Sequence, residues 1–475
     1  MEHDLTLAEA LGALAAGTTH DNLPKREAQS IPFRVLDIAG ICVRAGELAT
    51  TQSAIEFVVD QGGRPDSMVI GTDHRLPAPL AAFANGVAAH SLDYDDTHLP
   101  SILHPSASVI PAVLATAEAE GADARTVVAA TAAGLEVAVR LGMAGYDRGH
   151  RRNIWFDRGL HATSICGAIG SAAAAGRILG LDPAGIVDSM GVAASMASGI
   201  IEANRTGGTV KRIHCGWAAQ AGVTAAHMAR RGLTGPPTVF EGRFGLFEAF
   251  LGGEFFPDEA WAGMDPEHPA AHEWMIADIS YKPYPANHYT HCAIDAAMFL
   301  RDRHGLRPAD VDRIEVGVAG ATVRTIGEPP AVKQAPETGY QAQFSGPYVV
   351  AAALFGGSGL GLGLADFTDE LARDPDRREL MARVHVVPDP ECDEVYPDEF
   401  PAILRVRTRD GTELVKRVMA NRGGAQRPLT DDELAGKFSD NVAGLLDDAA
   451  RQQAIDVIHR FPDCELPDLL GALST

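Results

Sequence analysis

The sequence predicts a mainly α-helical protein with a smaller second domain of mixed α and β structure. Three observations support this prediction: Ala-rich apolar segments fill the first half of the chain, short β-branched runs follow, and helical patterns return after Pro428. Apolar segments longer than ten residues that are broken by Gly, Pro and Asp are typical of helices, whereas short β-branched runs are typical of strands. The predicted order is therefore helical, mixed and again helical.

The first part of the chain, from Thr6 to about Arg231, consists of these Ala-rich segments, and the clearest predicted helix covers residues 123–145. Small residues recur in them, as at Gly167 and Gly170. Such residues let neighbouring helix backbones approach closely, so we expect tight helix packing.

Four short runs in the second part of the chain predict strands, and they cover residues 314–318, 384–387, 403–406 and 414–418. The last two runs are joined by residues 409–412, in which Asp-Gly is a strong hairpin signal. After Pro428, Thr430 and Glu433 form a predicted capping box at a helix start. We therefore predict a helical domain from residues 1–272 and 424–475, and an α+β lid domain from residues 273–423, with a ligand cleft between them.

The composition predicts a folded protein whose net negative charge disfavours binding to polyanions. Of 475 residues, 46% are hydrophobic and 22% are charged, which is typical of globular chains. The 40 Lys and Arg against 63 Asp and Glu give a net charge of −23, which repels nucleic acids and anionic membranes. We expect neither as a partner. A small anionic substrate would need a local cluster of cationic groups.

The six cysteines contain no CxxC pair, so neither a zinc knuckle nor a dithiol redox motif is predicted. The N-terminus lacks the pattern of a signal peptide, and we expect a reduced, cytoplasmic protein. The most apolar stretch, residues 161–181, is mostly Ala and Gly and contains Arg177. It predicts a close-packed helix of a soluble protein rather than a membrane span.

The densest polar cluster is Asp93–His98, followed by His104-Pro105-Ser106. Charged side chains are seldom buried without partners, so this cluster in an apolar context indicates function. The alternative is a helix end, at which Asp96 or Thr97 serves as a cap. We do not expect a metal, because the residues lack an HExxH or EF-hand arrangement.

A second candidate region carries positive charge. Gly207-Gly208-Thr209 before Lys211 can open a helix whose free NH groups face an anion, and Lys211 adds a full charge there. The alternative is a plain helix start with a solvent-exposed lysine. His104 and His161 can change charge near neutral pH and so can move a proton, although a single histidine is more often structural.

Several of these segments resemble one family. Residues 88–98 with His104-Pro105-Ser106 resemble the best-known signature of the MmgE/PrpD family, which includes 2-methylcitrate dehydratase, cis-aconitate decarboxylase and iminodisuccinate epimerase. Further matches follow in the expected order at residues 159–163, 210–216, 281–285 and 343–348. The resemblance covers roughly residues 5–450. It implies a helical fold with an α+β lid, a homodimer and an enzyme without a cofactor.

The resemblance also implies the site residues. The expected catalytic residues are His104, His161, Lys211 and Asp93, and the expected substrate-binding residues are Thr97, Lys282, Asn287, His288 and Tyr348. Asp95 and Asp96 stay open as further candidates.

The match at Lys282 depends on the short segment 281–285 alone, and a solvated loop lysine is the alternative there. Cis-aconitate decarboxylases resemble one another in a histidine five residues after this lysine, whereas this chain has Asn287 there, with His288 next to it. The asparagine in place of this histidine disfavours decarboxylation. His291 is a further lid candidate or an ordinary packed histidine.

The predicted activity is that of a lyase that removes water from a 2-methylcitrate-like hydroxy acid. A base would take the proton next to a carboxylate, and an acid would protonate the departing hydroxyl. Decarboxylation and epimerisation share a carbanion-like species and stay open as alternatives. A non-catalytic protein that binds small polycarboxylates is the hypothesis from another class.

Overall fold

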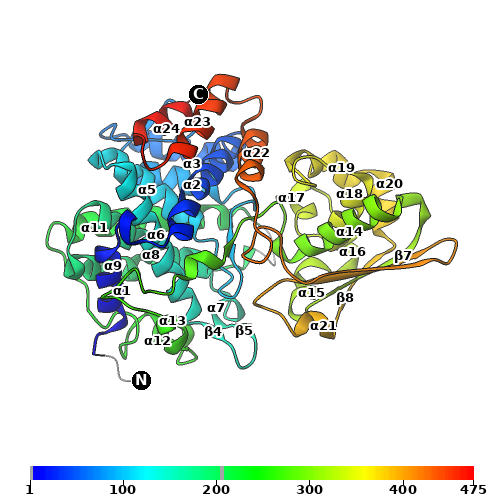
Figure 1. Cartoon of the computed structure of the whole chain (residues 1–475), viewed down its shortest axis with the longest axis horizontal. Helices are drawn as coiled ribbons and strands as arrows, with labels where there is room; N and C mark the ends of the chain where they lie inside the picture. The colour runs from blue at the N-terminus through cyan, green and yellow to red at the C-terminus, as the bar shows by residue number, and fades with distance from the viewer. Residues whose placement is uncertain (1–3, 204–207, 475) are drawn as a thin grey trace. The chain divides into compact units, whose positions relative to one another are not determined.

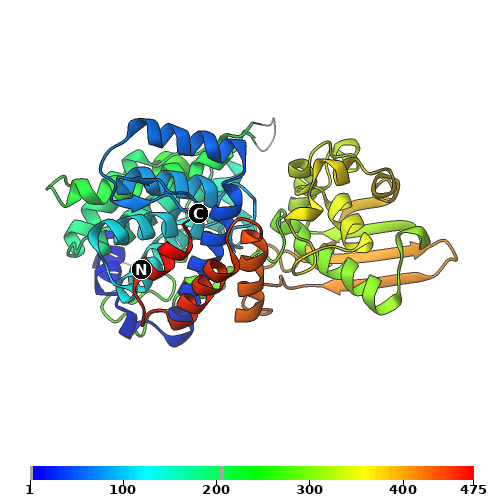
Figure 2. The same ribbon diagram turned by 90° about the horizontal axis from the view of Figure 1, so that it is seen from above.

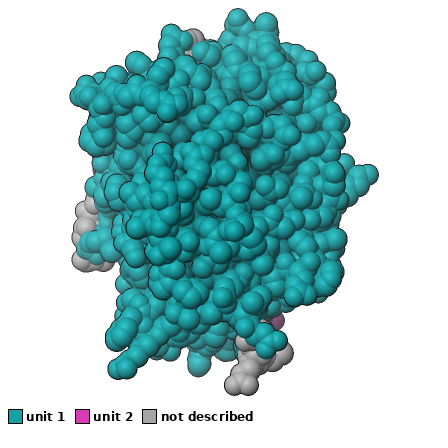
Figure 3. Space-filling model, turned by 90° about the vertical axis from the view of Figure 1, so that its left-hand side faces the viewer, with its two compact units in different colours: residues 1–279, 441–475 teal, residues 280–440 magenta. Residues whose placement is uncertain are grey.

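The computed structural model describes residues 4–203 and 208–474, and the chain divides into two compact units. Unit 1 consists of residues 1–279 and 441–475, coloured teal in Figure 3, and unit 2 consists of residues 280–440. The divisions at 279/280 and 440/441 differ from the predicted ones at 272/273 and 423/424. Unit 2 thus also includes the start of the helix that follows the predicted capping box.

Unit 1 is helical, as predicted, and both ends of the chain belong to it (Figure 1). Helix α8 lies at its centre and packs against α1, α5, α6, α9 and α11, while α23 from the C-terminal segment returns to α2. The elements of unit 1 are α1 (Leu7–Gly17), η1 (His20–Asn22), α2 (Lys25–Ala45), α3 (Ala49–Gln61), β1 (Ser67–Met68), β2 (Arg75–Leu76), α4 (Ala78–Ala89), β3 (Thr97–His98), α5 (Ser106–Glu120), α6 (Ala124–Met143), β4 (Tyr146–Asp147), β5 (Arg152–Asn153), α7 (Ile154–Asp157), α8 (Ala162–Ile178), α9 (Pro183–Met196), η2 (Val210–Arg212), α11 (Ile213–Ala229), α12 (Leu246–Leu251), α13 (Pro257–Trp261), η3 (Met275–Asp278), α23 (Asp448–Arg460) and α24 (Leu466–Ala472).

Glycines set the closest helix contacts in unit 1. A Cβ atom on Gly86 of α4 would lie 2.7 Å from the Cys215 carbonyl oxygen, and one on Gly216 of α11 would lie 2.5 Å from that of Phe83. No side chain fits in these gaps, so the two helix backbones touch. The predicted tight packing at Gly170 is confirmed, because a Cβ there would lie 2.4 Å from the Gly134 carbonyl oxygen of α6. The α4–α11 contact brings the end of α4 beside the start of α11.

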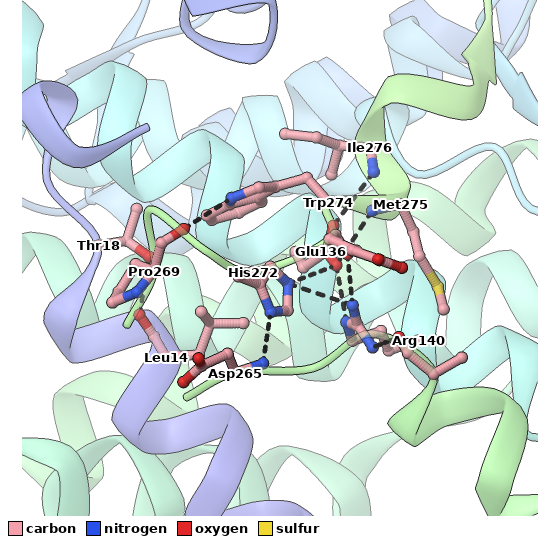
Figure 4. A network of polar contacts seen from close by, with 12 residues as sticks. Leu14, Thr18, Glu136, Arg140, Asp265, Pro269, His272, Trp274, Met275 and Ile276 are labelled. Atoms are coloured by element: carbon pink, nitrogen blue, oxygen red, sulfur yellow. Dashed lines mark hydrogen bonds and ion pairs between the residues drawn. The ribbon is translucent and has the colours of Figure 1, made fainter. Parts of the chain in front are cut away.

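A buried ionic network fastens the segment between α13 and η3 onto α6 (Figure 4). The Nε atom of Arg140 donates to Glu136 Oε1 at 2.7 Å, and His272 Nε2 lies 2.9 Å from the same oxygen. Glu136 also accepts the backbone NH groups of Met275 and Ile276 at 3.2 and 3.1 Å. Burial alone would raise the pKa of Glu136, but its cationic partners and the backbone NH groups lower it. The network is therefore a charged anchor with its hydrogen bonds made.

Unit 2 contains a four-stranded sheet in the order β10-β9-β7-β8, in which only β7 and β8 run parallel. Helix α14 packs against β9, β10 and α18 (Figure 2). The elements of unit 2 are η4 (His288–Thr290), α14 (His291–His304), η5 (Pro308–Asp310), β7 (Val311–Val318), α15 (Gly320–Ile326), α16 (Pro330–Lys333), α17 (Gly339–Ala342), α18 (Gly346–Phe355), η6 (Leu364–Asp366), α19 (Asp369–Arg373), α20 (Pro375–Met381), β8 (Val384–Pro388), α21 (Pro390–Asp393), β9 (Ala402–Thr408) and β10 (Glu413–Val418); β6 (Ile279–Ser280) and α22 (Asp431–Val442) extend across the divisions.

The predicted strands and turns of this region are confirmed. Strands β9 and β10 form an antiparallel hairpin, and the Asp410 carboxylate accepts the NH of Thr412 at 3.0 Å inside its turn. Thr430 and Glu433 form the predicted capping box of α22, since each side chain accepts the backbone NH of the other residue. The predicted fold class, mainly helical with a smaller α+β part, is therefore correct.

One helix in the described part of the chain, α6, is long and apolar enough to cross a membrane by length and composition. Its apolar window is 94% buried inside the protein. This is the behaviour of a core helix.

Candidate active site

The first site residues lie in the loop that follows α4. Helix α4 ends at Ala89 with His90 as its C-cap, and Asp93 has a φ of 53°. A residue other than Gly is uncommon in this left-handed region, and such backbone conformations gather at functional sites. Residues 90–99 of this loop are all buried, although they contain three carboxylates and the two histidines His90 and His98. Its polar groups are therefore held by specific partners.

Asp95 and His90 form a buried pair. The Asp95 Oδ2 atom lies 2.7 Å from His90 Nδ1, and neither side chain has any exposed surface. A carboxylate at this distance fixes the ring orientation and favours a proton on the bonded nitrogen.

Asp96 ties the same loop to two helices. Its carboxylate accepts from Arg34 of α2 at 2.9 Å and from the Ser106 hydroxyl at 2.5 Å. It also accepts the NH of Ser106, the first residue of α5, so Asp96 has the capping function that was its alternative interpretation. Burial raises the pKa of Asp96, against the opposing effects of Arg34 and Ser106. Asp96 therefore holds the loop in place.

His104 is oriented by this loop. Its Nδ1 atom lies 2.7 Å from the Asp96 carbonyl oxygen and 3.2 Å from Thr97 Oγ1, and its backbone NH donates to Thr163. A carbonyl oxygen only accepts, so Nδ1 carries the hydrogen. The Nε2 atom of a neutral His104 is then a proton acceptor.

His161 and His214 form a second buried pair. His161 precedes α8 as its N-cap, and its Nδ1 atom lies 2.8 Å from Nδ1 of His214 in α11. Burial lowers the pKa of both rings, and electrostatic interactions with His90 and Lys211 lower it further. The pKa of His214 falls to about 4 and that of His161 lies well below its usual value, so both rings are neutral at pH 7.

These rings belong to one cluster. The ring centroid of His90 lies 5.4 Å from that of His104 and 5.5 Å from that of His161, and the His161 and His214 centroids are 4.9 Å apart. Residues from α4, the loop before α5, the start of α8 and α11 thus converge. We call these four residues the histidine cluster.

Lys211 brings positive charge to the same loop. Its Nζ atom lies 3.4 Å from Asp93 Oδ1, and its side chain is 12% exposed. Lys211 lies in the short 3₁₀ helix η2, which continues directly into α11 at Ile213, so the lysine lies at a helix start as expected. Of the glycines expected to open this helix, Gly207 lies outside the described residues.

The structure thus brings together five of the predicted residues, His104, His161, Lys211, Asp93 and Thr97. His90 and His214 were not predicted as site residues, and Asp95 was an open candidate. A signal was present, because His90 lies in the family signature and His214 lies three residues after Lys211.

The remaining predicted residues belong to unit 2. Lys282 is 1% exposed, which excludes the solvated loop lysine that was its alternative. The Asn287 side chain accepts the NH of Tyr289 and so caps η4, which is a structural use of that side chain. His288 is buried, with its ring centroid 4.4 Å from that of His291.

Tyr348, a predicted substrate-binding residue, lies in the interior of unit 2. It has no exposed surface, and its hydroxyl donates to the Asp366 carbonyl oxygen. Burial raises its pKa to about 12. A phenol with this bond already made is a packing residue, and we leave Tyr348 out of the candidate site.

All six cysteines are free thiols. Within residues 4–203 and 208–474, no group of three or more His, Cys, Asp or Glu side chains is arranged to hold a metal ion.

Four histidines, Lys211 and the buried carboxylates of one loop thus lie in a single region of unit 1. Comparison with known proteins agrees with the resemblance seen in the sequence. Residues 9–258 match the MmgE/PrpD N-terminal domain, and residues 284–460 match the MmgE/PrpD C-terminal domain. The chain belongs to the MmgE/PrpD family.

Several relatives of known activity match along most of their length. Human cis-aconitate decarboxylase is 29% identical over 98% of this chain and 94% of its own, and the mouse enzyme is 30% identical over 85% and 78%. The 2-methylcitrate dehydratase of Salmonella typhimurium is 26% identical over 90% of this chain and 88% of its own. Decarboxylation and dehydration are both lyase reactions, and the chain is an enzyme of the lyase class.

Proposed function

We propose that the chain acts, without a cofactor, on a small di- or tricarboxylate by moving a proton at a carbon next to a carboxylate. The observation that carries this proposal is that the histidine cluster includes residues of the Asp93 loop, and that Lys211 Nζ lies 3.4 Å from the Asp93 carboxylate. Neutral histidines exchange protons near pH 7, and a lysine attracts a carboxylate. Both functions are needed to remove or add a proton on an acid.

The geometry supports a division of roles. His161 is suited to accept a proton because its lowered pKa keeps it neutral. Lys211 is suited to stabilise the extra negative charge that develops on the substrate carboxylate, which is the larger effect in such sites. The Asp93 carboxylate lies 3.4 Å from Lys211 Nζ. It would orient the lysine or accept a hydrogen bond from a substrate hydroxyl. Thr97 and His104 would serve the second proton transfer.

Dehydration of a 2-methylcitrate-like hydroxy acid is the first candidate reaction. The base takes the proton next to a carboxylate, the electron pair forms the double bond, and the hydroxyl on the adjacent carbon leaves as water after it gains a proton. Asn287 supports this candidate, because cis-aconitate decarboxylases resemble one another in having a histidine at this position. The capping use of the Asn287 side chain agrees with a position outside the chemistry.

Decarboxylation of a cis-aconitate-like acid is the second candidate. The bond to a carboxyl carbon breaks, carbon dioxide leaves, and the resulting carbanion gains a proton from the enzyme. The comparisons favour this candidate, with 29–30% identity to the human and mouse decarboxylases against 26% to the Salmonella typhimurium dehydratase.

Other parts of the proposal depend on the family resemblance. Lys282 is assigned to a second substrate carboxylate, with His288 beside it, because segment 281–285 matches the family motif. A cytoplasmic homodimer is proposed on the same basis. Nucleic acids and anionic membranes stay unfavourable partners because of the charge of −23.

A turnover screen in deuterated water tests the proposal. The purified protein is mixed with 2-methylcitrate, citrate, cis-aconitate and iminodisuccinate, and products are identified by NMR. Loss of water supports dehydration, whereas carbon dioxide with one new C–D bond supports decarboxylation. Deuterium exchange without either loss indicates an epimerase. Binding of these acids without turnover or exchange would contradict the proposal and indicate a non-catalytic binding protein. His104→Ala and Lys211→Ala are the controls.

A further inference from the structure

His214 has no function in the proposed mechanism, although its ring contacts the proposed base. Its Nδ1 atom lies 2.8 Å from Nδ1 of His161, and both residues are buried. At this distance a hydrogen bond joins the two nitrogens. His214 is therefore the hydrogen-bond partner of the residue that is proposed to take a proton from the substrate.

The packing of α8 against α11 holds these two rings together. A Cβ atom on Gly222 of α11 would lie 2.7 Å from the backbone nitrogen of Ala172 in α8, so the two helix backbones are in contact. At the start of α8, the Ser164 hydroxyl donates to the His214 carbonyl oxygen at 3.0 Å. The two ring positions are therefore set by the helix packing as well as by the bond between the rings.

The bond between the rings limits where their protons lie. Burial lowers the pKa of both rings, so both are neutral at pH 7. A neutral imidazole has one N–H donor and one bare acceptor nitrogen. Two bare Nδ1 atoms, or two protonated ones, would repel each other at 2.8 Å. One Nδ1 atom of the pair therefore carries a proton, and the other accepts its hydrogen bond.

This constraint gives the pair two neutral states. When the shared proton lies on Nδ1 of His161, Nε2 of the same ring is bare and can accept a proton. When the shared proton lies on Nδ1 of His214, His161 carries its hydrogen on Nε2 and can donate it. His161 is thus a base in the first state and an acid in the second.

The surrounding groups favour states in which the pair carries no added charge. His90 and His104 lie near His161, and Lys211 acts on both rings of the pair. Electrostatic interactions with all three residues lower the pKa of His161. A route that does not leave His161 positively charged is therefore suited to this site.

We propose that His214 shares one proton with His161, and that the movement of this proton switches His161 between a base and an acid. His214 is a positioning residue, because it acts through His161 and not on the substrate. The catalytic consequence rests on the proposed function, whereas the sharing of the proton does not.

Proton removal then takes three steps. The C–H bond next to the substrate carboxylate breaks, its electrons stay on the substrate, and its proton forms an N–H bond at Nε2 of His161. The proton on Nδ1 of His161 moves to Nδ1 of His214, and Nε2 of His214 releases its own proton to water. His161 is left neutral, with a hydrogen for a departing hydroxyl or a carbanion. After that donation, the shared proton returns to His161 and His214 regains a proton from water.

The sharing of the proton is measured by NMR of the wild-type protein labelled with ¹⁵N-histidine, near neutral pH and without substrate. Signals are assigned with His161→Gln and His214→Asn or, where a variant does not fold, from contacts between ring protons and neighbouring side chains. The expected result is one protonated and one bare Nδ1 atom, or two Nδ1 signals averaged between these positions. Two bare Nδ1 atoms, or a positively charged ring in the pair, would overturn the proposal whatever the enzyme turns over.

The catalytic consequence is measured with His214→Asn. The Asn amide keeps a hydrogen-bonding group close to the position of Nδ1, but it does not pass on a proton. The value of kcat should fall at least about tenfold, a part of the roughly 10²–10⁴-fold that acid–base catalysis supplies, while KM changes by less than about twofold. His227→Asn is the matched control, because His227 lies in the same helix and its ring contacts Arg230 at 3.2 Å. Its kcat should not change.

His214→Leu separates proton sharing from orientation, because it removes the hydrogen bond altogether. It should lower kcat at least as much as His214→Asn, and circular dichroism establishes that each variant is folded. A folded His214→Asn variant with the wild-type kcat would show that His214 only orients His161, and would overturn the proposal. If neither variant folds, the NMR result on the wild-type protein decides. Absence of turnover in the wild-type protein would instead count against the proposed function.

Discussion

Two buried polar clusters of unit 1 differ in how completely their hydrogen bonds are made. In the network of Glu136, Arg140 and His272, each buried side-chain nitrogen and oxygen has a partner, as Figure 4 shows for the contacts drawn. In the histidine cluster, Nε2 of His90 has none within the described residues. Buried networks in which every polar group is hydrogen-bonded make a fold rigid. A buried polar group without a partner is more often found at a functional site. The two clusters should therefore respond differently to substitution.

The largest expected effect is on stability, at the saturated network. Arg140→Met leaves Glu136 buried without its main counter-charge, and should lower the free energy of unfolding by about 3–5 kcal/mol. Urea denaturation measures this loss. The exposed Arg125 forms ion pairs with Asp21 and Asp463, and Arg125→Met should cost at most about 1 kcal/mol. Equal costs for the two variants would contradict a structural function for the network.

The next effect is on catalysis, at the edge of the histidine cluster. Lys211→Met removes the charge proposed to stabilise the reacting carboxylate, and should lower kcat/KM by about 10²–10³-fold without a loss of stability. Steady-state kinetics on the substrate found in the screen gives this number. The matched control is Lys25→Met, at an exposed lysine. A similar loss of kcat/KM in both variants would show that the effect is not specific to the position of Lys211.

A third effect concerns pH and a buried histidine in the same loop. Burial lowers the pKa of His98 from 6.5 to about 4, so the folded protein binds fewer protons there than the unfolded chain. The resulting stability is complete above pH 6.5 and is lost as the pH falls toward 4, by up to about 3 kcal/mol. His98→Gln should flatten this slope in denaturation measured at several pH values. His74→Gln, at an exposed histidine, should leave it unchanged.

The smallest effect is expected in unit 2. Tyr348→Phe removes one buried hydrogen bond to the Asp366 carbonyl oxygen and should cost about 1 kcal/mol of stability. Activity should stay within twofold, because the phenol is assigned to packing. A folded variant with a tenfold loss of kcat/KM would return Tyr348 to the substrate site.

Local patterns in the sequence predicted most of the fold. The helix over 123–145 appears as α6, and the Asp-Gly turn and the Thr430 capping box both lie where they were predicted. These features depend on neighbours in the chain, which a sequence displays directly. The division between the units was displaced by seven residues at one end and seventeen at the other, because it depends on long-range packing.

The candidate site was predicted less completely. Family motifs identified His104, His161 and Lys211, but not the part taken by His90 and His214. Their proximity depends on the contact of α4 with α11 at Gly86 and Gly216, which no local pattern reveals. Likewise, the motif that contains Tyr348 gave no sign that its hydroxyl is used inside unit 2.

The rates of His161→Gln and Arg140→Met, each expressed per folded molecule, distinguish a catalytic histidine cluster from a structural ionic network. His161→Gln should lose at least about 10²-fold in kcat, the lower end of general-base catalysis, while Arg140→Met should keep the wild-type rate within twofold. A folded His161→Gln variant with normal turnover, or an Arg140→Met variant that is stable but inactive, would contradict this distinction.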